Sequence, residues 1–249
     1  MAAAVRQWEP VVPPSLRDAF RAEFMQLAHD HERALATIAE IWGHRDRAYA
    51  FDEGTGLARR QPFMTHLTTL LTASSDNAGA VCVLFLDLDG LKSINDRSGH
   101  EAGDRAIAAA GHIIRDAVRV DRHEDVMMRT GEEDLAVSRN GGDEFLIALE
   151  LKTPDDVANV APRVKLRVDD PARQRAYGYV ADPPLSISVG AVACRLPVPP
   201  LIPAQMVREL IATADGQMYA SKRDGHVHVA LGHFTNQLTI EREWTIATQ

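Results

Sequence analysis

The chain has 249 residues, of which 45% are hydrophobic and 25% are charged, a composition that fits one globular core domain plus an extension. A net charge of -8 and the lack of any lysine- and arginine-rich block exclude a basic surface for nucleic acid. No stretch approaches the roughly 20 apolar residues of a membrane span, which excludes a membrane-embedded protein.

No signal peptide is expected from the first residues, and the cysteines indicate a reducing compartment. Met1 to Val5 lack the basic start and the long apolar core of a signal peptide. Cys82 and Cys194 are far apart and have no metal-ligand spacing, so both are expected to be reduced core thiols. These features predict a soluble, cytoplasmic protein.

A long helix is expected within residues 1–48, which we treat as an N-terminal extension. Ser15 is a suitable N-cap, and Asp18 occupies the reciprocal position of a capping box. The helix could run for about eight turns to Trp42. Its apolar residues lie near heptad spacing, interrupted by His31, at Phe20, Phe24, Leu27, Ala34, Ile38 and Ile41. The pattern favours an amphipathic helix lying on its own domain, and the alternative is a coiled coil or helical pair joining two protomers.

Helix-like and strand-like stretches alternate over residues 49–230, which we treat as one domain, followed by a C-terminal tail at 231–249. This order predicts an α+β fold with helices on one side of a mainly antiparallel sheet. Helices are expected near residues 60–73, 101–118, 154–169 and 204–223, and strands near 81–86, 135–138, 145–149 and 185–190.

Acidic residues follow the apolar strand that begins at Val81. The segment Asp87-Leu88-Asp89-Gly90 ends this strand, and carboxylates there are costly to leave unpaired if the strand is buried. The spacing does not continue as a calcium loop, because Lys92 and Ser98 stand where that loop has glycine and glutamate. The alternatives are solvated acids at a strand end or a magnesium site that also uses nucleotide phosphates.

A second acidic pair follows the turn Asn140-Gly141-Gly142. These turn residues suit the positive φ angles of a hairpin, which by itself could have no further role. The adjacent carboxylates of Asp143 and Glu144, however, repel each other unless a cation or protons neutralise them. The two acidic segments together therefore indicate a metal-nucleotide site.

Four segments in this order resemble the GGDEF family of diguanylate cyclases and cover about residues 50 to 228. They are Asp52-Glu53-Gly54-Thr55-Gly56-Leu57, the stretch from Asp87 to Asp104, the turn from Asn140 to Phe145, and the stretch from Ala214 to Lys222. The resemblance implies a palm-like fold with a ferredoxin-like core, as in class III nucleotide cyclases. It also implies that two GTP are condensed into cyclic di-GMP with release of two pyrophosphates.

The resemblance implies that this chain uses Mg²⁺, with Mn²⁺ as an alternative. The ion would be held by Asp87, the carbonyl of Leu88, Asp143 and Glu144. It would neutralise the phosphates and lower the pKa of the attacking 3′-hydroxyl. Asp143 and Glu144 are therefore the expected catalytic residues, with Asp143 the acid nearest that hydroxyl.

The other implied site residues bind GTP. Gly141 and Gly142 would let the substrate lie against the backbone, and Lys222 and Lys92 would bind its phosphates. Guanine selection would fall to Asn95 and Asp104, since a carboxylate can accept from both N1–H and the exocyclic amine. His100 would contact the base or ribose, or else be a structural cap before a helix. Without the family motif, Asp104 would be better explained as an acid in the first turn of a helix, where the helix dipole favours negative charge.

This chain departs from the family pattern at several positions. Gly54 and Arg59 replace a leucine and an asparagine of the upstream signature, and His226 replaces an arginine after Lys222. Histidine would be a weaker, pH-dependent phosphate partner. Leu135 occupies the place of the aspartate of the inhibitory R-x-x-D site, so inhibition through that site is expected to be absent.

Each such domain offers one GTP half-site, so catalysis is expected to require a homodimer, possibly joined by the N-terminal helix. An alternative function is a catalytically weak or inactive domain that binds GTP or a protein partner and acts by regulation. An unidentified regulatory protein is a further expected partner.

Overall fold

The structure, a computed structural model, describes residues 48–73, 79–120, 126–127, 135–180, 183–196, 198 and 203–248. The chain divides into two compact units, Met1–Tyr49 and Ala50–Gln249, and the fold below is that of the second. The helix expected over residues 15–42 lies outside the described residues. In the part of the chain described, no helix is both long enough and apolar enough to cross a membrane.

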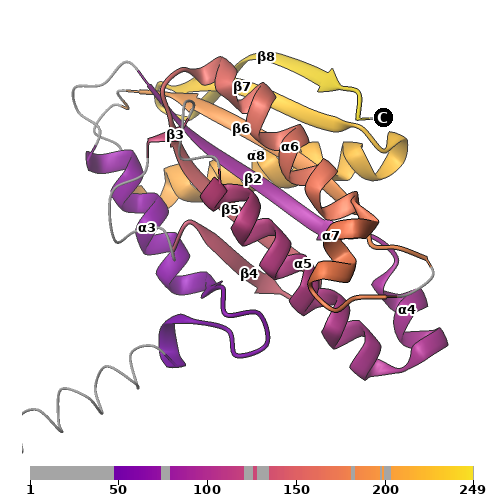
Figure 1. The fold of residues 1–249 in the computed structure, drawn as a ribbon. Coiled ribbons are helices and arrows are strands. Elements are labelled where there is room, and N and C mark those ends of the chain that lie inside the picture. The colour runs from indigo at the N-terminus through magenta and orange to yellow at the C-terminus, as the bar shows by residue number, and fades with distance from the viewer. Residues whose placement is uncertain are drawn as a thin grey trace, which may run out of the picture. The chain divides into compact units, whose positions relative to one another are not determined.

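A mixed, mainly antiparallel sheet forms the centre of the second unit (Figure 1). The strand order is β1-β4-β5-β2-β6-β7-β8, and β3 pairs with β5 beside this path. The β1–β4 and β6–β7 pairs are parallel, whereas the other pairs are antiparallel. This arrangement confirms the predicted α+β class. The strands are β1 (Ala58–Arg59), β2 (Ala80–Leu88), β3 (Val126–Met127), β4 (Val137–Gly141), β5 (Glu144–Leu151), β6 (Ile187–Arg195), β7 (Val227–Phe234) and β8 (Leu238–Ile246).

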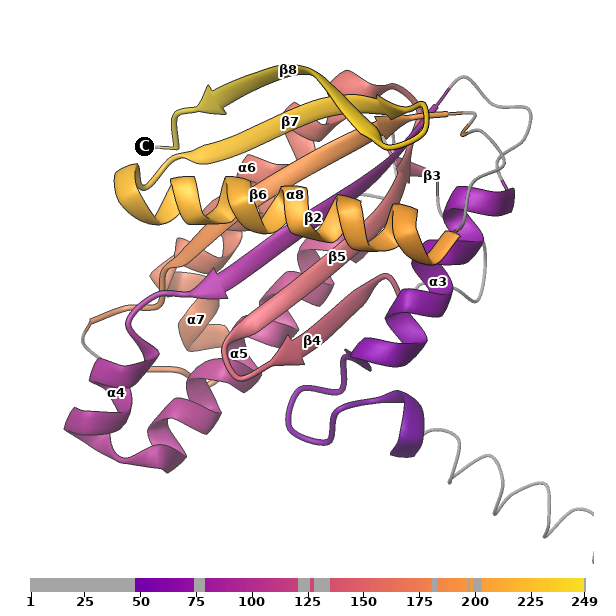
Figure 2. The ribbon, with the colours of Figure 1, turned by 180° about the vertical axis from the view of Figure 1, so that it is seen from behind.

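Helices cover both faces of the sheet, which corrects the expectation that they lie on one side. One face carries α5 (His100–Val120), α6 (Val157–Asp169) and α7 (Pro171–Ala176), and the other carries α3 (Arg60–Ala73) and α8 (Pro203–Asp224) (Figures 1 and 2). A cluster of buried apolar side chains fills the space on each face. The physical reason lies in β2, which is buried at every position and has no polar side to leave in water.

Most predicted elements are confirmed, whereas several short elements and the strands β7 and β8 were not predicted. The helix predicted at 60–73 is α3, and the one predicted at 204–223 is α8. The helix predicted at 154–169 begins with a 3-10 turn, Pro154–Asp156, before α6. The sequence pattern does not predict α4 (Leu91–Ser98) or α7, because α4 buries only Ile94 and so lacks a clear apolar period.

The contact between α8 and the sheet depends on a glycine. A Cβ atom at Gly190 in β6 would lie 1.9 Å from the backbone nitrogen of Met218 and 2.3 Å from the carbonyl oxygen of Ala214. The backbone of α8 therefore lies directly on β6 at this point. This close approach sets the distance between the last turn of α8 and the central strand β2, which pairs with β6.

The segment 231–246, expected to belong to a C-terminal tail, lies in β7 and β8 of the sheet. β7 runs parallel to β6, and β8 forms the outer strand at the edge (Figure 2). Trp244 and Ile246 pack against the core cluster on the α5/α6 face. The boundary expected after residue 230 thus falls inside a strand, because apolar residues of β7 complete the core on both faces.

Candidate functional site

The register of the sheet brings the two acidic segments together. Asp87 at the end of β2 lies opposite Glu144 at the start of β5 and, on its other side, opposite Ser188 in β6. The backbone N–H of Leu88 donates to the carbonyl of Asp143 at 3.0 Å. Asp87 and Glu144 each lie two residues from a member of the core cluster under α3 and α8. Both side chains therefore face the α3/α8 side of the sheet.

Lys222 in the last turn of α8 is paired with Asp87. Its Nζ lies 2.9 Å from Asp87 Oδ1, and the Asp87 side chain is only 11% exposed. Burial raises the pKa of Asp87, helped by the nearby charges of Asp143 and Asp89, although the bond from Lys222 acts in the opposite direction. Burial would lower the pKa of Lys222, but the bond to Asp87 and the nearby carboxylates outweigh it and raise that pKa. The site thus concentrates negative charge around one ammonium group.

The hairpin turn is open and depends on its glycines. Gly141 has φ 150° and Gly142 has φ 55°, and a Cβ on either would meet no atom within 4 Å. Arg139 closes the turn, since its Nε and Nη2 donate to the carbonyl of Gly142 at 3.1 and 3.0 Å. The exposed backbone of the turn therefore leaves room for a ligand to approach closely.

Arg139 also ties the turn to the beginning of the domain. Its Nη1 lies 3.3 Å from Asp52 Oδ1, which in turn accepts hydrogen bonds from the N–H and the hydroxyl of Thr55. Burial would raise the pKa of Asp52, but the bonds from Thr55 and the charge of Arg139 outweigh it and lower that pKa. The turn at Asp52–Thr55 and the turn at Gly141–Gly142 are thus one hydrogen-bonded unit.

A second set of contacts reaches Glu144. Asn140 donates from Nδ2 to Glu144 Oε2 at 2.8 Å and accepts at Oδ1 from Arg60 Nη1 at 3.0 Å. Arg60 is the first residue of α3. The sequence motif indicates Asn140 only as a turn residue. It gives no sign of the roles of Arg60 and Arg139, because their partners Asn140 and Asp52 are 80 and 87 positions away.

The residues expected to read guanine lie on α4 and α5. Asn95 Oδ1 is buried and has no hydrogen-bond partner among the described residues. A Cβ at Gly103 would lie 2.0 Å from this oxygen, so the amide lies against the first turn of α5, next to Asp104. Asp104, His100 and Lys92 are exposed. The structure therefore places Asn95 and Asp104 at the same helix pair.

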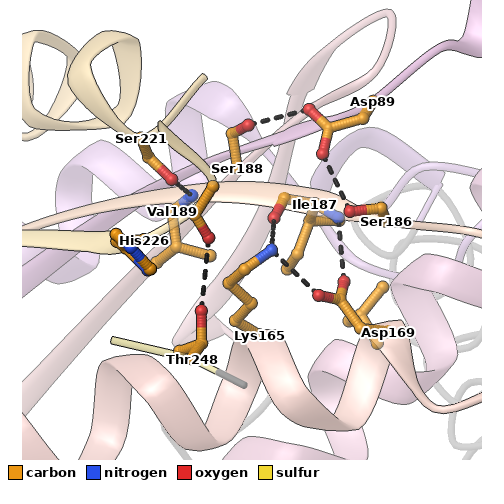
Figure 3. A network of polar contacts seen from close by, with 12 residues as sticks. Asp89, Lys165, Asp169, Ser186, Ile187, Ser188, Val189, Ser221, His226 and Thr248 are labelled. Atoms are coloured by element: carbon orange, nitrogen blue, oxygen red, sulfur yellow. Dashed lines mark hydrogen bonds and ion pairs between the residues drawn. The ribbon is translucent and has the colours of Figure 1, made fainter. Parts of the chain in front are cut away.

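Asp89 is occupied by contacts within the protein. Its two carboxylate oxygens accept hydrogen bonds from Ser186 and Ser188 at 3.0 and 2.8 Å (Figure 3). No sequence motif marks these two serines, which stand two positions apart at the start of β6. Asp89 thus joins the end of β2 to β6, and Asp87 remains the acid of this segment that faces Lys222.

The same network fixes the start of β6 from the helix side (Figure 3). The buried Lys165 of α6 donates to the carbonyl of Ile187 at 2.6 Å and pairs with Asp169 at 2.8 Å. Ser221, the neighbour of Lys222, accepts from the N–H of Val189 at 3.0 Å. These bonds hold both α6 and the end of α8 in place against the strand beside Asp87.

His226, which stands where the family pattern has arginine, lies at the turn between α8 and β7. Its backbone N–H donates to Asp224 at 3.0 Å, and its ring Nδ1 is buried with no hydrogen-bond partner in the described part of the chain. Gly225, just before it, has φ 77° and accepts at its carbonyl from the Thr248 hydroxyl at 3.2 Å. The buried nitrogen is therefore not presented to solvent as a phosphate donor.

The carboxylates of Asp87, Asp143 and Glu144 are chemically suited to bind a hard divalent cation. Carboxylate oxygens are the ligands that Mg²⁺ prefers, and the ammonium of Lys222 shows that a cation is accommodated beside Asp87. In the arrangement observed, no group of three or more His, Cys, Asp or Glu side chains within the described ranges is placed to hold a metal ion. Asp87 is paired with Lys222, and one carboxylate oxygen of Glu144 accepts from Asn140.

Comparison with known proteins identifies a family model. The model described as "Diguanylate cyclase, GGDEF domain" matches residues 49–228. The chain is 29% identical over 247 residues to the diguanylate cyclase TpbB of Pseudomonas aeruginosa, covering 96% of this chain and 51% of TpbB. It is 32% identical over 145 residues to the bifunctional diguanylate cyclase/cyclic di-GMP phosphodiesterase MucR of the same species, covering 57% of this chain and 18% of MucR. The chain thus spans about half or less of the length of these relatives.

Solved structures show the same fold. The GGDEF domain of TpbB from Pseudomonas aeruginosa superposes with a TM-score of 0.52 at 28% identity, covering 70% of this chain and 96% of that one. The coiled coil and GGDEF domain of DgcB from Caulobacter crescentus, in complex with c-di-GMP, gives a TM-score of 0.58 at 20% identity, covering 83% of this chain and 96% of that one.

Proposed function

The chain belongs to the GGDEF-domain family of diguanylate cyclases, and we propose that it condenses two GTP into cyclic di-GMP and two pyrophosphates. The observation that carries this proposal is the meeting of Asp87, Glu144 and Lys222 on one face of the sheet, beside the open glycine turn. In this reaction, the 3′-hydroxyl of each GTP attacks the α-phosphorus of the other. Such chemistry depends on positioning and charge neutralisation, which these residues can supply.

Asp87, Leu88, Asp143 and Glu144 are proposed to hold Mg²⁺, or Mn²⁺ in its place. When bound, the ion would neutralise the phosphates and acidify the attacking hydroxyl. Asp143 is the proposed acceptor nearest that hydroxyl. The burial of Asp87 beside Asp143 and Asp89 supports this assignment, because a buried carboxylate among other carboxylates needs a positive partner. Lys222 is one such positive partner of Asp87.

The substrate is proposed to lie along the turn and between α4 and α5. Gly141 and Gly142 allow its phosphates to approach the backbone, and Lys222, with Lys92, provides positive charge. Asn95 Oδ1 has no donor among the residues that the structure describes, and this supports base recognition, since a buried acceptor without a donor is costly unless a ligand supplies one. Asp104 would accept from N1–H and the exocyclic amine of guanine, and His100 would contact base or ribose. These contacts would select GTP over ATP, because adenine lacks this pair of donors.

Two domains are proposed to face each other as a homodimer, because one domain offers a single half-site. We test the function by incubating the protein with GTP and Mg²⁺ beside an Asp143→Asn variant and resolving the products by chromatography and mass spectrometry. Cyclic di-GMP from the parent alone is expected. Tight GTP binding without turnover by a verified dimer would instead favour a regulatory domain that acts through a protein partner.

A further inference from the structure

Asn140 is the extra residue of a β-bulge at the end of β4. The register between β4 and β5 passes from Arg139↔Phe145 to Gly141↔Glu144, so Asn140 has no partner of its own in β5. A bulge redirects the side chain of the extra residue and strengthens the local twist. Here the redirected amide meets the side chain of Glu144, four residues later.

The partners of the amide determine its orientation. Arg60 can only donate, so the atom 3.0 Å from its Nη1 is the amide oxygen. The carboxylate of Glu144 accepts, so the atom 2.8 Å from its Oε2 is the amide nitrogen. Reversing the amide would place a donor against Arg60 and an acceptor against Glu144. Both bonds involve a charged group, which makes them stronger than bonds between neutral groups.

The contact acts on one oxygen of the Glu144 carboxylate. Oε2 is engaged by Asn140, and none of the hydrogen bonds or ion pairs found among the described residues engages Oε1. Asp87 lies opposite Glu144 in the sheet, and Asp143 precedes it in the chain, so like charges would otherwise turn the carboxylate away. Hydrogen bonds from neighbouring side chains commonly orient the carboxylates that bind metals.

We propose that Asn140, with Arg60 behind it, is a positioning residue that fixes Glu144 with Oε1 available to a divalent cation. The proposal rests on the proposed cyclase function, in which Glu144 is a metal-binding residue. The Asn140 amide acts through the carboxylate and touches neither substrate nor metal. The arrangement connects the start of α3, just after the Asp52–Thr55 turn, to the acid at the start of β5.

The experiment measures Mn²⁺ binding separately from turnover. The full chain is saturated with a GTP analogue that has a methylene bridge between the α- and β-phosphates, and free Mn²⁺ is followed by electron paramagnetic resonance. Asn140→Leu, which keeps the size but loses both bonds, is expected to weaken Mn²⁺ binding about tenfold. Asn140→Gln, which retains an amide, is expected to recover part of this loss. The GTP/ITP preference is expected to stay unchanged, because Asn140 is not among the base-reading residues.

A double-mutant cycle tests the role of Arg60. Arg60→Ala alone is expected to weaken Mn²⁺ binding by a smaller factor, and to have no further effect in the Asn140→Leu background, because its effect passes through the amide. Arg59→Ala is the matched control: it removes the same charge one residue earlier, where the guanidinium bonds to the carbonyl of Phe51 at 2.9 Å. This control is expected to bind Mn²⁺ like the parent.

Different results would contradict the positioning role of Asn140 and the proposed cyclase function. A parent that makes cyclic di-GMP, with an Asn140→Leu variant that binds Mn²⁺ equally well, would overturn the positioning role and leave the cyclase intact. Loss of thermal stability without any change in the Mn²⁺ dissociation constant would also overturn it. A parent that binds neither Mn²⁺ nor the GTP analogue would overturn both.

Discussion

At the scale of single residues, Asp52 carries a pH-dependent part of the stability. Its carboxylate accepts from the N–H and hydroxyl of Thr55 at 3.0 and 2.8 Å and pairs with Arg139 at 3.3 Å. Its pKa is lowered in the folded protein, so ionised Asp52 stabilises the fold above the unfolded-state value of 3.8. This stabilisation disappears as the pH falls through the lower folded-state pKa.

We predict that Asp52→Asn lowers the free energy of unfolding by about 1–3 kcal/mol at pH 7, because it weakens the bonds from Thr55 and Arg139. The difference from the parent should stay constant down to about pH 5 and shrink below the unfolded-state pKa. Urea unfolding over a pH series measures it. Glu53→Gln, at the exposed next position, should change stability little. A difference that grows as the pH falls would contradict the assignment.

The lack of a side chain at Gly103 leaves room for the side-chain amide of Asn95. Alanine there would place Cβ 2.0 Å from Asn95 Oδ1, so the amide must rotate away. We predict that Gly103→Ala raises the KM for GTP about tenfold and reduces the preference for GTP over ITP, while thermal stability is kept or increased because alanine favours helices. Steady-state kinetics and melting curves measure both quantities.

The Asn95→Ala background controls this prediction. If Gly103 acts through Asn95, adding Gly103→Ala to Asn95→Ala should change KM little further. An independent loss of equal size in that background would show that the substitution acts by another route, such as the approach of the added Cβ to within 3.3 Å of Leu91 Cδ1.

At the scale of elements, the site depends on how closely α8 lies on β6. Gly190 allows that approach, and Lys222 follows in the last turn of the same helix, where it reaches Asp87. The neighbouring Ser221 accepts from Val189 and fixes the end of the helix against the strand. A shift of α8 should therefore affect both stability and the Lys222–Asp87 pair.

We predict that Gly190→Ala destabilises the fold by about 2 kcal/mol or more, because its Cβ would meet backbone atoms of α8 that cannot move independently. GTP binding should weaken as well. Gly216→Ala in α8 is the matched control, since its Cβ would meet no atom within 4 Å. It should stabilise the helix by about 0.5–1 kcal/mol. Equal behaviour of the two variants in denaturant would contradict the close-packing argument.

At the scale of the whole molecule, the proposed reaction needs two copies of the chain. We predict that the specific activity rises with enzyme concentration until the dimer is saturated, because each protomer contributes one GTP half-site. Initial rates across a dilution series, with light scattering on the same samples, measure this dependence. A constant specific rate from a protein that scatters only as a monomer would refute the dimer requirement.

The sequence by itself determined the family, the α+β class and most of the longer elements. Each of the four motif segments is an unbroken stretch of sequence and can be recognised by itself. The apolar runs of β2 and β5 and the long helices α3 and α8 also carry strong local patterns. The proposed metal-binding acids could also be chosen from the sequence, because Asp87, Asp143 and Glu144 stand in recognisable short motifs.

Only the tertiary structure decided how these residues are held and where the domain ends. Arg60 and Asn140 are 80 positions apart, and Arg139 and Asp52 are 87 apart, so their bonds depend on strand pairing that no local pattern encodes. The same holds for the covering of both sheet faces and for β7 and β8, whose place follows from the parallel pairing with β6. Local periodicity reports which residues prefer burial, whereas contacts between distant segments arise only when the whole core is packed.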